Sequence, residues 1–461
     1  MCAIQMDESL FDKAIEIVLD APKHDLAAKI GAFTVASGTE DILYSPVDSD
    51  IIFGRLQDPE PKTTIKAAET ASKAFGSWAK TSPADRKAVL DKLVSLMEPR
   101  LYRMAAECVL STGMTRDCAF NEAVTALETV KKAAAACNSP LGKPRGVWAV
   151  ISLRSSPLAA PVGYAAMAIA AGNSVVVMPS GACPKPVFSA YELFKLAGVP
   201  DGVINVVCDR IDRFIPELCD TLEVIGTVAS GCGPAMDDMM FLAVDDDMQF
   251  INEVKGMNPV VVAAPGDVKK AAVTILESAT ANSGMGLYAC SKVLVRAEDE
   301  RNLLAALIEK LKDFKVGDPT YADTAMGPLM NEKTEQAFLR LKDEYAAYVA
   351  YGGKKVPCDA QGLYYTPLLL TGVEEESEIL YADTGLPVII LRPYASVDAL
   401  IEELDQTECG LSVGLISTDS KTLNAVKKFA AEENLKVWGN EGSRGLKAVT
   451  SAEPKDFAKK N

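Results

Sequence analysis

Short apolar runs alternate with helical segments over most of the chain, and this alternation limits the folds that the sequence can adopt. A first series of runs follows Gly146, at 147–152, 174–178, 203–207 and 223–228. A second series follows Pro259, at 260–263, 291–295, 387–391, 411–416 and 436–438. Strands that alternate with helices form parallel sheets with helical crossovers. The pattern therefore predicts an α/β fold with two doubly wound parallel sheets.

The strand runs and the segments around them predict the domain limits. Runs such as Val175–Val177 are apolar without alternation, as strands buried on both faces should be. Residues 1–60 are weakly patterned, whereas 64–136 have helical periodicity. We predict N-terminal helices and a Rossmann-like nucleotide-binding domain, then a second α/β domain, then a C-terminal return segment with an oligomerisation strand. Their predicted limits are 1–252, 253–435 and 436–461.

Composition excludes several classes of function. The 461 residues include 47 basic and 63 acidic side chains, a net charge of −16, which does not suit a chain that neutralises nucleic-acid phosphates. His24 is the only histidine, so neither a histidine metal site nor a histidine base is expected. The eleven cysteines contain no CxxC pair, and their odd number favours reduced thiols in the cytoplasm.

One long uncharged segment, 155–184, requires a membrane test. It is long enough to span a bilayer. However, Pro157, Pro161 and Pro179 interrupt it, and its second half has the pattern of a strand. We therefore expect a buried helix followed by a buried strand, and no membrane association. The first ten residues are acidic and do not predict a secretory signal.

Short motifs occur in a fixed order after the N-terminal helices. They are Gly172–Ser180 (GNSVVVMPS), Glu253–Pro259 (EVKGMNP), Asn282–Gly284 (NSG), Met326–Leu329 (MGPL) and Leu386–Val388 (LPV). In this order and spacing the chain resembles the aldehyde dehydrogenase superfamily, over about residues 64–440. The resemblance implies a nucleotide-binding domain, a catalytic domain and a small oligomerisation element. It also implies oxidation of aldehydes with NAD or NADP.

The family's reaction needs a thiolate, donors for an oxyanion, a nicotinamide and a carboxylate base. Its cysteine stands three residues after the glycine of Asn-x-Gly, and counting from Gly284 gives Leu287. Leucine has no lone pair to donate, so we expect a pseudoenzyme. Glu253 matches the family's general base, although a structural carboxylate is an alternative. Cys290 is the nearest thiol; it is either a displaced nucleophile or a buried core cysteine.

The positions that resemble cofactor contacts also depart from the family. Ser155 matches the oxyanion asparagine, or Arg154 does if the register slips by one residue. Beside Pro179 and Ser180, the lysine and glutamate that hold the adenosine ribose are replaced by Met178 and Gly181. Gly231 and Cys232 lie where the family has its phosphate-binding turn, and the alternative is a tight turn without a ligand. Asp383 replaces the glutamate near the nicotinamide ribose. We expect NAD or NADP binding to be weak or lost.

Together these departures favour a binding, scaffolding or regulatory role, with a homodimer or a protein partner and a small-molecule ligand. The alternative is an NAD(P)-dependent aldehyde oxidoreductase that uses Cys290 and Glu253. The connection from 139 to 147 is short, and 446–450 is the candidate closing strand. We therefore expect a reduced oligomerisation element. No metal site is predicted.

Overall fold

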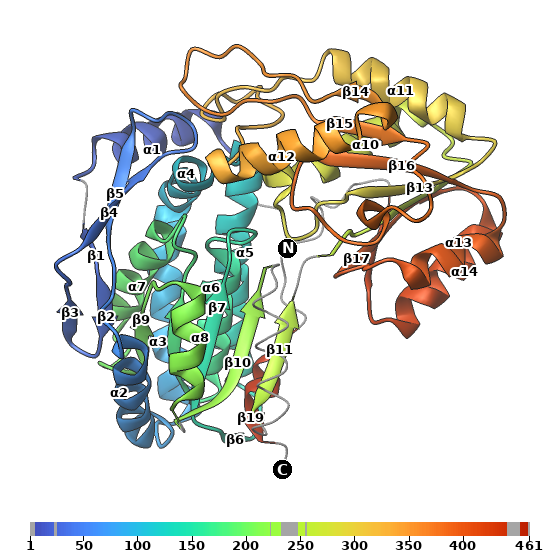
Figure 1. Cartoon of the computed structure of the whole chain (residues 1–461). Helices are drawn as coiled ribbons and strands as arrows, with labels where there is room; N and C mark the ends of the chain where they lie inside the picture. Colours follow the sequence, from blue (N-terminus) through green and yellow to red (C-terminus); the bar gives the residue numbers. More distant parts are fainter. Residues whose placement is uncertain are drawn as a thin grey trace.

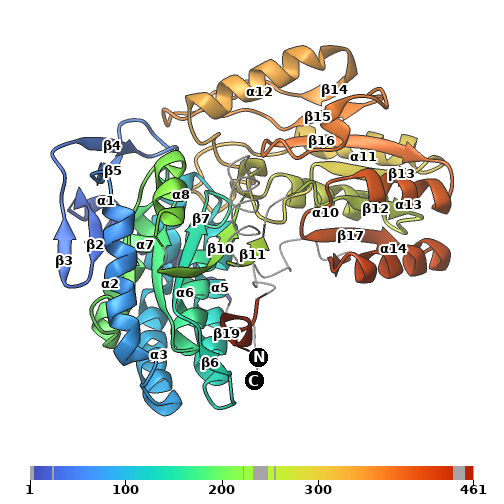
Figure 2. The ribbon, with the colours of Figure 1, turned by 60° about the horizontal axis from the view of Figure 1, so that its bottom comes forward.

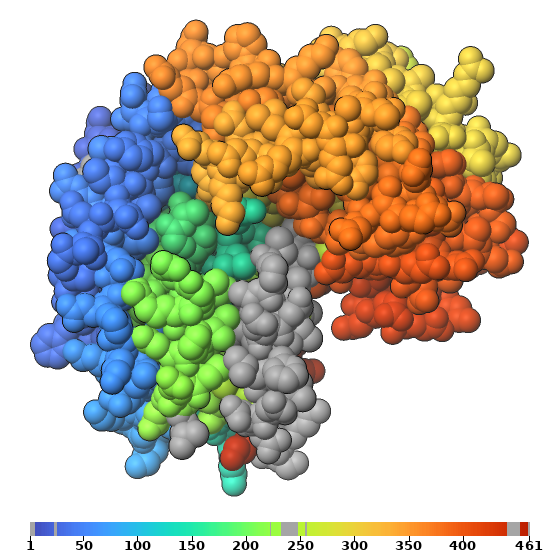
Figure 3. All heavy atoms as spheres, in the orientation of Figure 1, coloured from blue at the N-terminus to red at the C-terminus, as the bar shows by residue number. Residues whose placement is uncertain are grey.

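The computed structural model describes residues 5–22, 25–221, 223–231, 248–253, 256–439 and 452–459. Two seven-stranded sheets, each covered by helices, form two lobes that lie side by side (Figures 1 and 2). The prediction of two doubly wound α/β units is confirmed. In the space-filling view, the second lobe overhangs the first at the top of the molecule (Figure 3).

The first sheet combines five parallel strands with two antiparallel strands at one edge. In spatial order the strands are β11 (Gln249–Glu253), β10 (Val224–Ser230), β7 (Val147–Ser152), β8 (Ser174–Met178), β9 (Ile204–Val206), β2 (Ala28–Ile30) and β3 (Phe33–Val35). Because β8 and β10 flank β7 on opposite sides, the chain reverses its winding there. Ligands of open α/β sheets bind at such a reversal, outside the carboxyl ends of the strands.

Helices cover both faces of this sheet. They are α1 (Glu8–Asp20), α2 (Thr63–Trp78), α3 (Pro83–Met97), η1 (Glu98–Arg100), α4 (Leu101–Thr112), α5 (Arg116–Ala136), α6 (Ala159–Ala170), α7 (Lys185–Ala197) and α8 (Ile211–Cys219). Val175 and Val177 belong to the core with α3 to α7, whereas Val176 belongs to the core with α2 and α8. Successive strand residues point to opposite faces, which explains why the run is apolar throughout.

The weakly patterned N-terminal region forms a small sheet of its own. It consists of β1 (Asp25–Leu26), β5 (Ile52–Gln57) and β4 (Glu40–Tyr44), in that order. These strands were not predicted, because β4 is largely exposed and carries polar and apolar residues without a regular alternation.

The second sheet is parallel except for one edge strand. Its spatial order is β14 (Val349–Gly352), β15 (Leu368–Thr371), β16 (Val388–Tyr394), β13 (Lys292–Arg296), β12 (Val260–Ala263), β17 (Ser412–Ser417) and β18 (Lys436–Trp438). The associated helices are α10 (Val268–Ala279), η2 (Ala281–Gly284), α11 (Glu300–Lys312), α12 (Glu332–Glu344), η3 (Ala346–Tyr348), η4 (Glu378–Leu380), α13 (Val397–Gln406) and α14 (Ser420–Glu432). β11, which ends at Glu253, belongs to the first sheet. β18 is an edge strand of the second sheet.

The C-terminal segment returns to the first domain. η6 (Pro454–Phe457) leads into β19 (Ala458–Lys459), which pairs antiparallel with β6 (Lys143–Pro144). Phe457 is fully buried with its ring centroid 4.6 Å from that of Trp148, and its carbonyl accepts a 2.8 Å hydrogen bond from Asn173. The candidate closing strand 446–450 lies outside the described residues.

The uncharged segment 155–184 forms buried α6 and β8, as expected. Within the described part of the chain, no helix combines the length and hydrophobicity that a bilayer span requires.

We predict that Phe457→Ala lowers the free energy of unfolding by about 3–5 kcal/mol, because it leaves a cavity beside Trp148. Phe33→Ala removes the same atoms from a side chain that is 74% exposed, and it should change the free energy by less than about 0.5 kcal/mol. Urea unfolding of both variants measures the difference. Equal effects would show that the C-terminal segment does not stabilise the first domain.

Candidate functional site

The carboxyl ends of β7, β10 and β11 lie level with one another. Ser230 pairs in register with Ser152 on one side and Glu253 on the other. Gly231 follows with φ at +126°, and a Cβ there would lie 2.5 Å from the Leu153 Cβ. Its N–H donates to the Glu253 carbonyl at 3.2 Å. Close backbone packing therefore requires glycine at this predicted cofactor position, while Cys232 lies outside the described residues.

A tight turn from the second domain lies beside these strand ends. Asn282, Ser283 and Gly284 all have positive φ, at 49°, 51° and 84°. A Cβ at Gly284 would lie 2.2 Å from the Leu386 carbonyl carbon, so only glycine fits. The Asn282 amide donates to the Arg154 carbonyl of the first domain at 3.3 Å. The turn thus connects the two domains immediately before Leu287.

Asn258 holds the next part of this loop. It is fully buried with φ at 45°, and its amide group donates to the carbonyls of Leu287 and Ala289, both at 3.2 Å. Its carbonyl oxygen accepts from the N–H groups of Leu411 and Ser412 at the start of β17. One side chain therefore fixes the backbone at the predicted nucleophile position against the second sheet.

The structure places Leu287 and Cys290 in different surroundings. Leu287 is 4% exposed and lies in the loop just described. Cys290 is 2% exposed and belongs to the hydrophobic core between the second sheet, α10 and α11, with its sulfur 3.9 Å from the Ile275 carbonyl on α10. This environment is that of a core cysteine.

Glu253 lies in a group of polar side chains that we call the Glu253 cluster: Glu253, Tyr164 on α6, Tyr288 and Lys436 at the start of β18. Glu253, Tyr164 and Tyr288 are at most 6% exposed, and Lys436 is partly buried. Burial and then the nearby Glu253 carboxylate raise the pKa values of both tyrosines. Lys436 donates a hydrogen bond to the Tyr288 hydroxyl. The cluster therefore joins acidic, phenolic and amino groups from both domains.

Ser155 and Asp383 lie on the two sides of the domain boundary. Ser155 is buried, and its hydroxyl oxygen has no hydrogen-bond partner within the described residues. A Cβ at Gly385 would lie 3.9 Å from an Arg154 guanidinium nitrogen and 4.0 Å from an Asp383 carboxylate oxygen, so both groups flank Gly385. The cationic side chain of Arg154 therefore reaches the segment that resembles the nicotinamide-ribose support.

The neighbouring Ser156 contacts a buried acid. Its hydroxyl donates to both carboxylate oxygens of Glu122 on α5 at 3.1 Å, and the N–H groups of Leu158 and Ala159 donate to the same carboxylate. Glu122 thus caps the N-terminus of α6. Burial raises its pKa from the ordinary 4.5 to about 7, although these hydrogen bonds oppose the shift.

A cavity of about 580 Å³ opens at the carboxyl ends of β7 and β8. Ser180 and Gly181 line it, together with acidic residues that include Glu40, Asp41 and Asp209. Pro179 is buried, and its carbonyl accepts from the thiol of Cys208 at 3.7 Å. Met178 is 2% exposed and Gly181 has no side chain, so neither supplies a polar group to a ribose. These residues do not fit a dinucleotide in the way that the family pattern requires.

Cys183 is a thiol near the turn that the sequence analysis did not single out. It packs against Met285 and Met330, and burial raises its pKa to about 12. The thiol is therefore protonated near neutral pH and is a poor nucleophile. Within the described residues, no three histidine, cysteine or acidic side chains are grouped as a metal site.

Comparison with known proteins identifies the family. The sequence model of the Aldehyde dehydrogenase family matches residues 35–449. The chain belongs to the aldehyde dehydrogenase family.

Relatives of this aldehyde dehydrogenase-family chain are distant but match nearly full length. The 1-pyrroline-5-carboxylate dehydrogenase of Geobacillus sp. (strain WCH70) is 23% identical, covering 98% of this chain and 91% of its own length. The alpha-ketoglutaric semialdehyde dehydrogenase of Bacillus subtilis (strain 168) is 25% identical, with 81% of each chain covered.

Solved structures show the same fold. A 1-pyrroline-5-carboxylate dehydrogenase variant from Thermus thermophilus has a TM-score of 0.87 at 19% identity, covering 98% of this chain and 93% of its own. Betaine aldehyde dehydrogenase from Staphylococcus aureus, solved with NAD⁺, has a TM-score of 0.85 at 22% identity, covering 93% of this chain and 90% of its own. The predicted aldehyde dehydrogenase-like fold is therefore confirmed.

We predict that Asn258→Ala lowers the free energy of unfolding by about 3 kcal/mol, because it leaves several buried backbone groups unpaired. Asn434 has a similar φ of 55° but an exposed side chain, so Asn434→Ala serves as the control for backbone conformation. Asn434→Ala should lower the free energy of unfolding by about 1 kcal/mol. Chemical denaturation compares the two, and equal costs would contradict the role given to Asn258.

We also predict a pH dependence of stability from Glu122. Its pKa is higher in the folded protein than the ordinary 4.5, so the folded state binds the proton more tightly. The contribution of Glu122 protonation to the free energy of unfolding is fully present below pH 4.5 and is lost as the pH rises through about 7. Glu122→Gln should remove about 3 kcal/mol of this decline in the free energy of unfolding.

Urea unfolding of the Glu122→Gln variant and the wild type across this pH range tests the prediction. Glu128→Gln changes an acid on the same helix that pairs with Lys131 at the surface, and it should leave the pH slope unchanged. A Glu122→Gln protein with the wild-type slope would show that Glu122 titrates normally.

Proposed function

We propose that this member of the aldehyde dehydrogenase family binds a small molecule and does not oxidise aldehydes through a thiolate. The proposal depends chiefly on Leu287, the hydrocarbon side chain at the position where the family pattern has its nucleophilic cysteine. Loss of the nucleophile in a comparable covalent enzyme lowers turnover on the order of 10⁶-fold. Asn258 fixes the loop that carries Leu287, so the same loop does not readily present another residue there.

A displaced cysteine is the alternative, and the contacts of the nearby thiols count against it. Cys290 is packed in the core beside α10, so it would have to leave that core to meet Glu253. Cys183 contacts Met285, two residues before Leu287, but its pKa of about 12 keeps the thiol protonated. Cys183 therefore lacks the thiolate character that addition to a carbonyl requires, and Cys290 is buried in the core away from Glu253.

Cofactor use is proposed to be weak or lost. Met178 and Gly181 offer no polar group to the ribose, and the adjoining cavity is lined by several carboxylates. Arg210 also lines this cavity and Arg213 pairs with Asp209, so the missing ribose contacts, and not charge repulsion, support this part of the proposal. We propose that the protein acts through binding, as a homodimer or with a protein partner, in a scaffolding or regulatory role.

We expect purified protein to show no aldehyde-dependent formation of NADH or NADPH above a no-enzyme control. Calorimetric titration with NAD⁺ and NADP⁺ should show no saturable binding. Both results follow from the missing sulfur and the missing ribose contacts. Absorbance of the reduced nicotinamide and the heat of titration are the two measurements.

Cys290→Ala distinguishes the two functions. Under the proposal, both the wild type and the Cys290→Ala variant form NADH only at the rate of the no-enzyme control. Aldehyde-dependent NADH production by the wild type that Cys290→Ala abolishes would establish the displaced-cysteine enzyme instead. Leu287→Cys tests the vestigial pocket, because a gain of turnover would show that only the nucleophile is missing.

A further inference from the structure

The Glu253 cluster places a carboxylate, two phenols and an amine together at the boundary between the two domains. Glu253 and Tyr164 come from the first domain, and Tyr288 and Lys436 come from the second. Burial of charged and hydroxyl groups costs free energy unless they interact with one another. Tyr288 directly follows Leu287, so the cluster adjoins the position that resembles the family's reaction centre.

We infer that Lys436 is the carbonyl-reactive group of this site and condenses with an aldehyde to form an imine. The inference deepens the proposed binding role, on which it rests, because it gives the ligand a chemical class and a mode of attachment. It assigns no redox step and requires no cofactor.

The position of the Lys436 amine supports this assignment. Its Nζ donates to the Tyr288 hydroxyl and lies 5.0 Å from the centroid of the same ring. The amine is therefore held at the side chain next to Leu287 and does not extend freely into solvent. Placement of a nucleophile by a hydrogen-bonded neighbour is the usual arrangement of covalent sites.

The charges around Lys436 leave more neutral amine than an exposed lysine has. Burial lowers its pKa, the Glu253 carboxylate opposes this, and the cationic Lys132 on α5 lowers it again. The phenol of Tyr288 faces the amine and remains protonated, since its own pKa is raised. A neutral amine is the form that adds to a carbonyl carbon.

The proposed condensation is balanced without an oxidant. The ammonium of Lys436 first loses a proton to the Glu253 carboxylate. The neutral nitrogen then forms a bond to the aldehyde carbon, and the carbonyl oxygen takes a proton from Tyr288. The Tyr288 oxygen then takes a proton back from the nitrogen, and Glu253 returns its proton to the new hydroxyl, which leaves as water while the carbon–nitrogen double bond forms. The net products are the protonated imine and one water.

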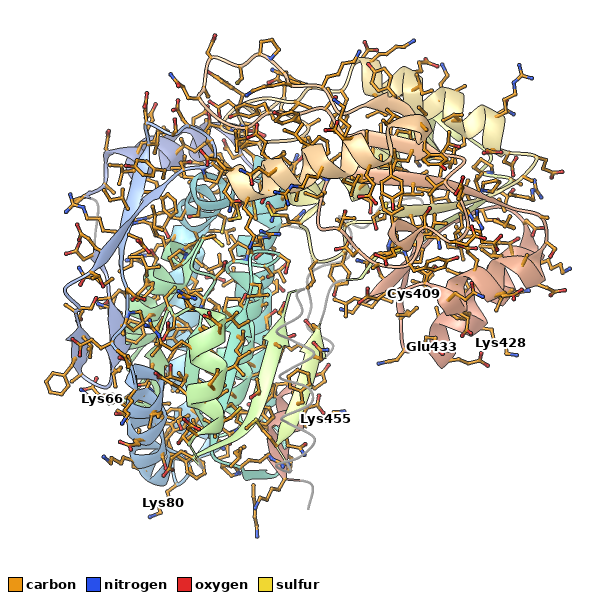
Figure 4. The ribbon with its side chains drawn as sticks, in the orientation of Figure 1. Lys66, Lys80, Cys409, Lys428, Glu433 and Lys455 are labelled. Atoms are coloured by element: carbon orange, nitrogen blue, oxygen red, sulfur yellow. The ribbon has the colours of Figure 1, made fainter. Side chains whose placement is uncertain are left out.

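The test uses the full-length protein with propanal and sodium cyanoborohydride near neutral pH. The reagent reduces an imine to a stable propyl-lysine, and peptide mapping measures the rate at each lysine. Lys428 on α14, labelled in Figure 4, is the internal reference. Its side chain is 78% exposed. A lowered pKa raises the fraction of neutral amine near neutral pH. We therefore expect Lys436 to be labelled several-fold faster than Lys428.

Variants separate a chemical role from a structural one. Lys436→Arg keeps the charge and should abolish this label, while Lys428→Arg should leave the Lys436 rate unchanged. Tyr288→Phe should slow labelling of Lys436 several-fold without affecting Lys428. If Lys436→Arg fails to fold, the ratio of the Lys436 and Lys428 labelling rates in the wild-type protein tests the inference by itself.

Labelling of Lys436 no faster than that of Lys428 would overturn the inference. An unchanged rate in Tyr288→Phe would overturn the role of Tyr288. Neither result depends on nicotinamide reduction, so failure here is distinguishable from failure of the proposed function.

Discussion

The buried amide of Asn258 is the constraint on which the arrangement of the second domain at the site depends. It occupies a left-handed conformation directly before β12 and links the loop at 287–289 to the start of β17. Its donor and acceptor atoms satisfy backbone groups that the sheet itself leaves unpaired. Because the same loop carries Leu287 and Tyr288, one amide determines which side chains reach the domain boundary.

The first domain contributes to this boundary through its strand ends. The register of β7, β10 and β11 brings Ser152, Ser230 and Glu253 level, and Gly231 then lies against Leu153. This framework follows the family's fold, and amino and phenolic groups lie around the Glu253 carboxylate. Under the proposed function, the hydrocarbon side chain of Leu287 stands where the family pattern has sulfur. The same backbone thus supports a different set of polar atoms, in keeping with the independence of fold and function.

The sequence predicted the parts of the fold that depend on local pattern. β7, β8 and β12 match their predicted limits, because strands buried on both faces are uniformly apolar. β11 was missed because it is a half-exposed edge strand with mixed residues.

Other features could not be predicted from sequence motifs. Leu287 followed from spacing within one motif, but Tyr164 and Lys436 are distant in sequence and meet only through the docking of the two domains. Glu122 could have been noticed as an acid in an alanine-rich helix; only the structure shows that it caps α6.

The pairing of β19 with β6 has a consequence for the order in which the protein is built. Residues 143 and 144 leave the ribosome long before 458 and 459, and the entire second domain is synthesised between them. Until then Trp148 lacks the ring of Phe457 that covers it in the native protein. The first domain to be translated is therefore among the last to be completed, and an arrested chain would expose an aromatic surface to the quality-control machinery of the cell.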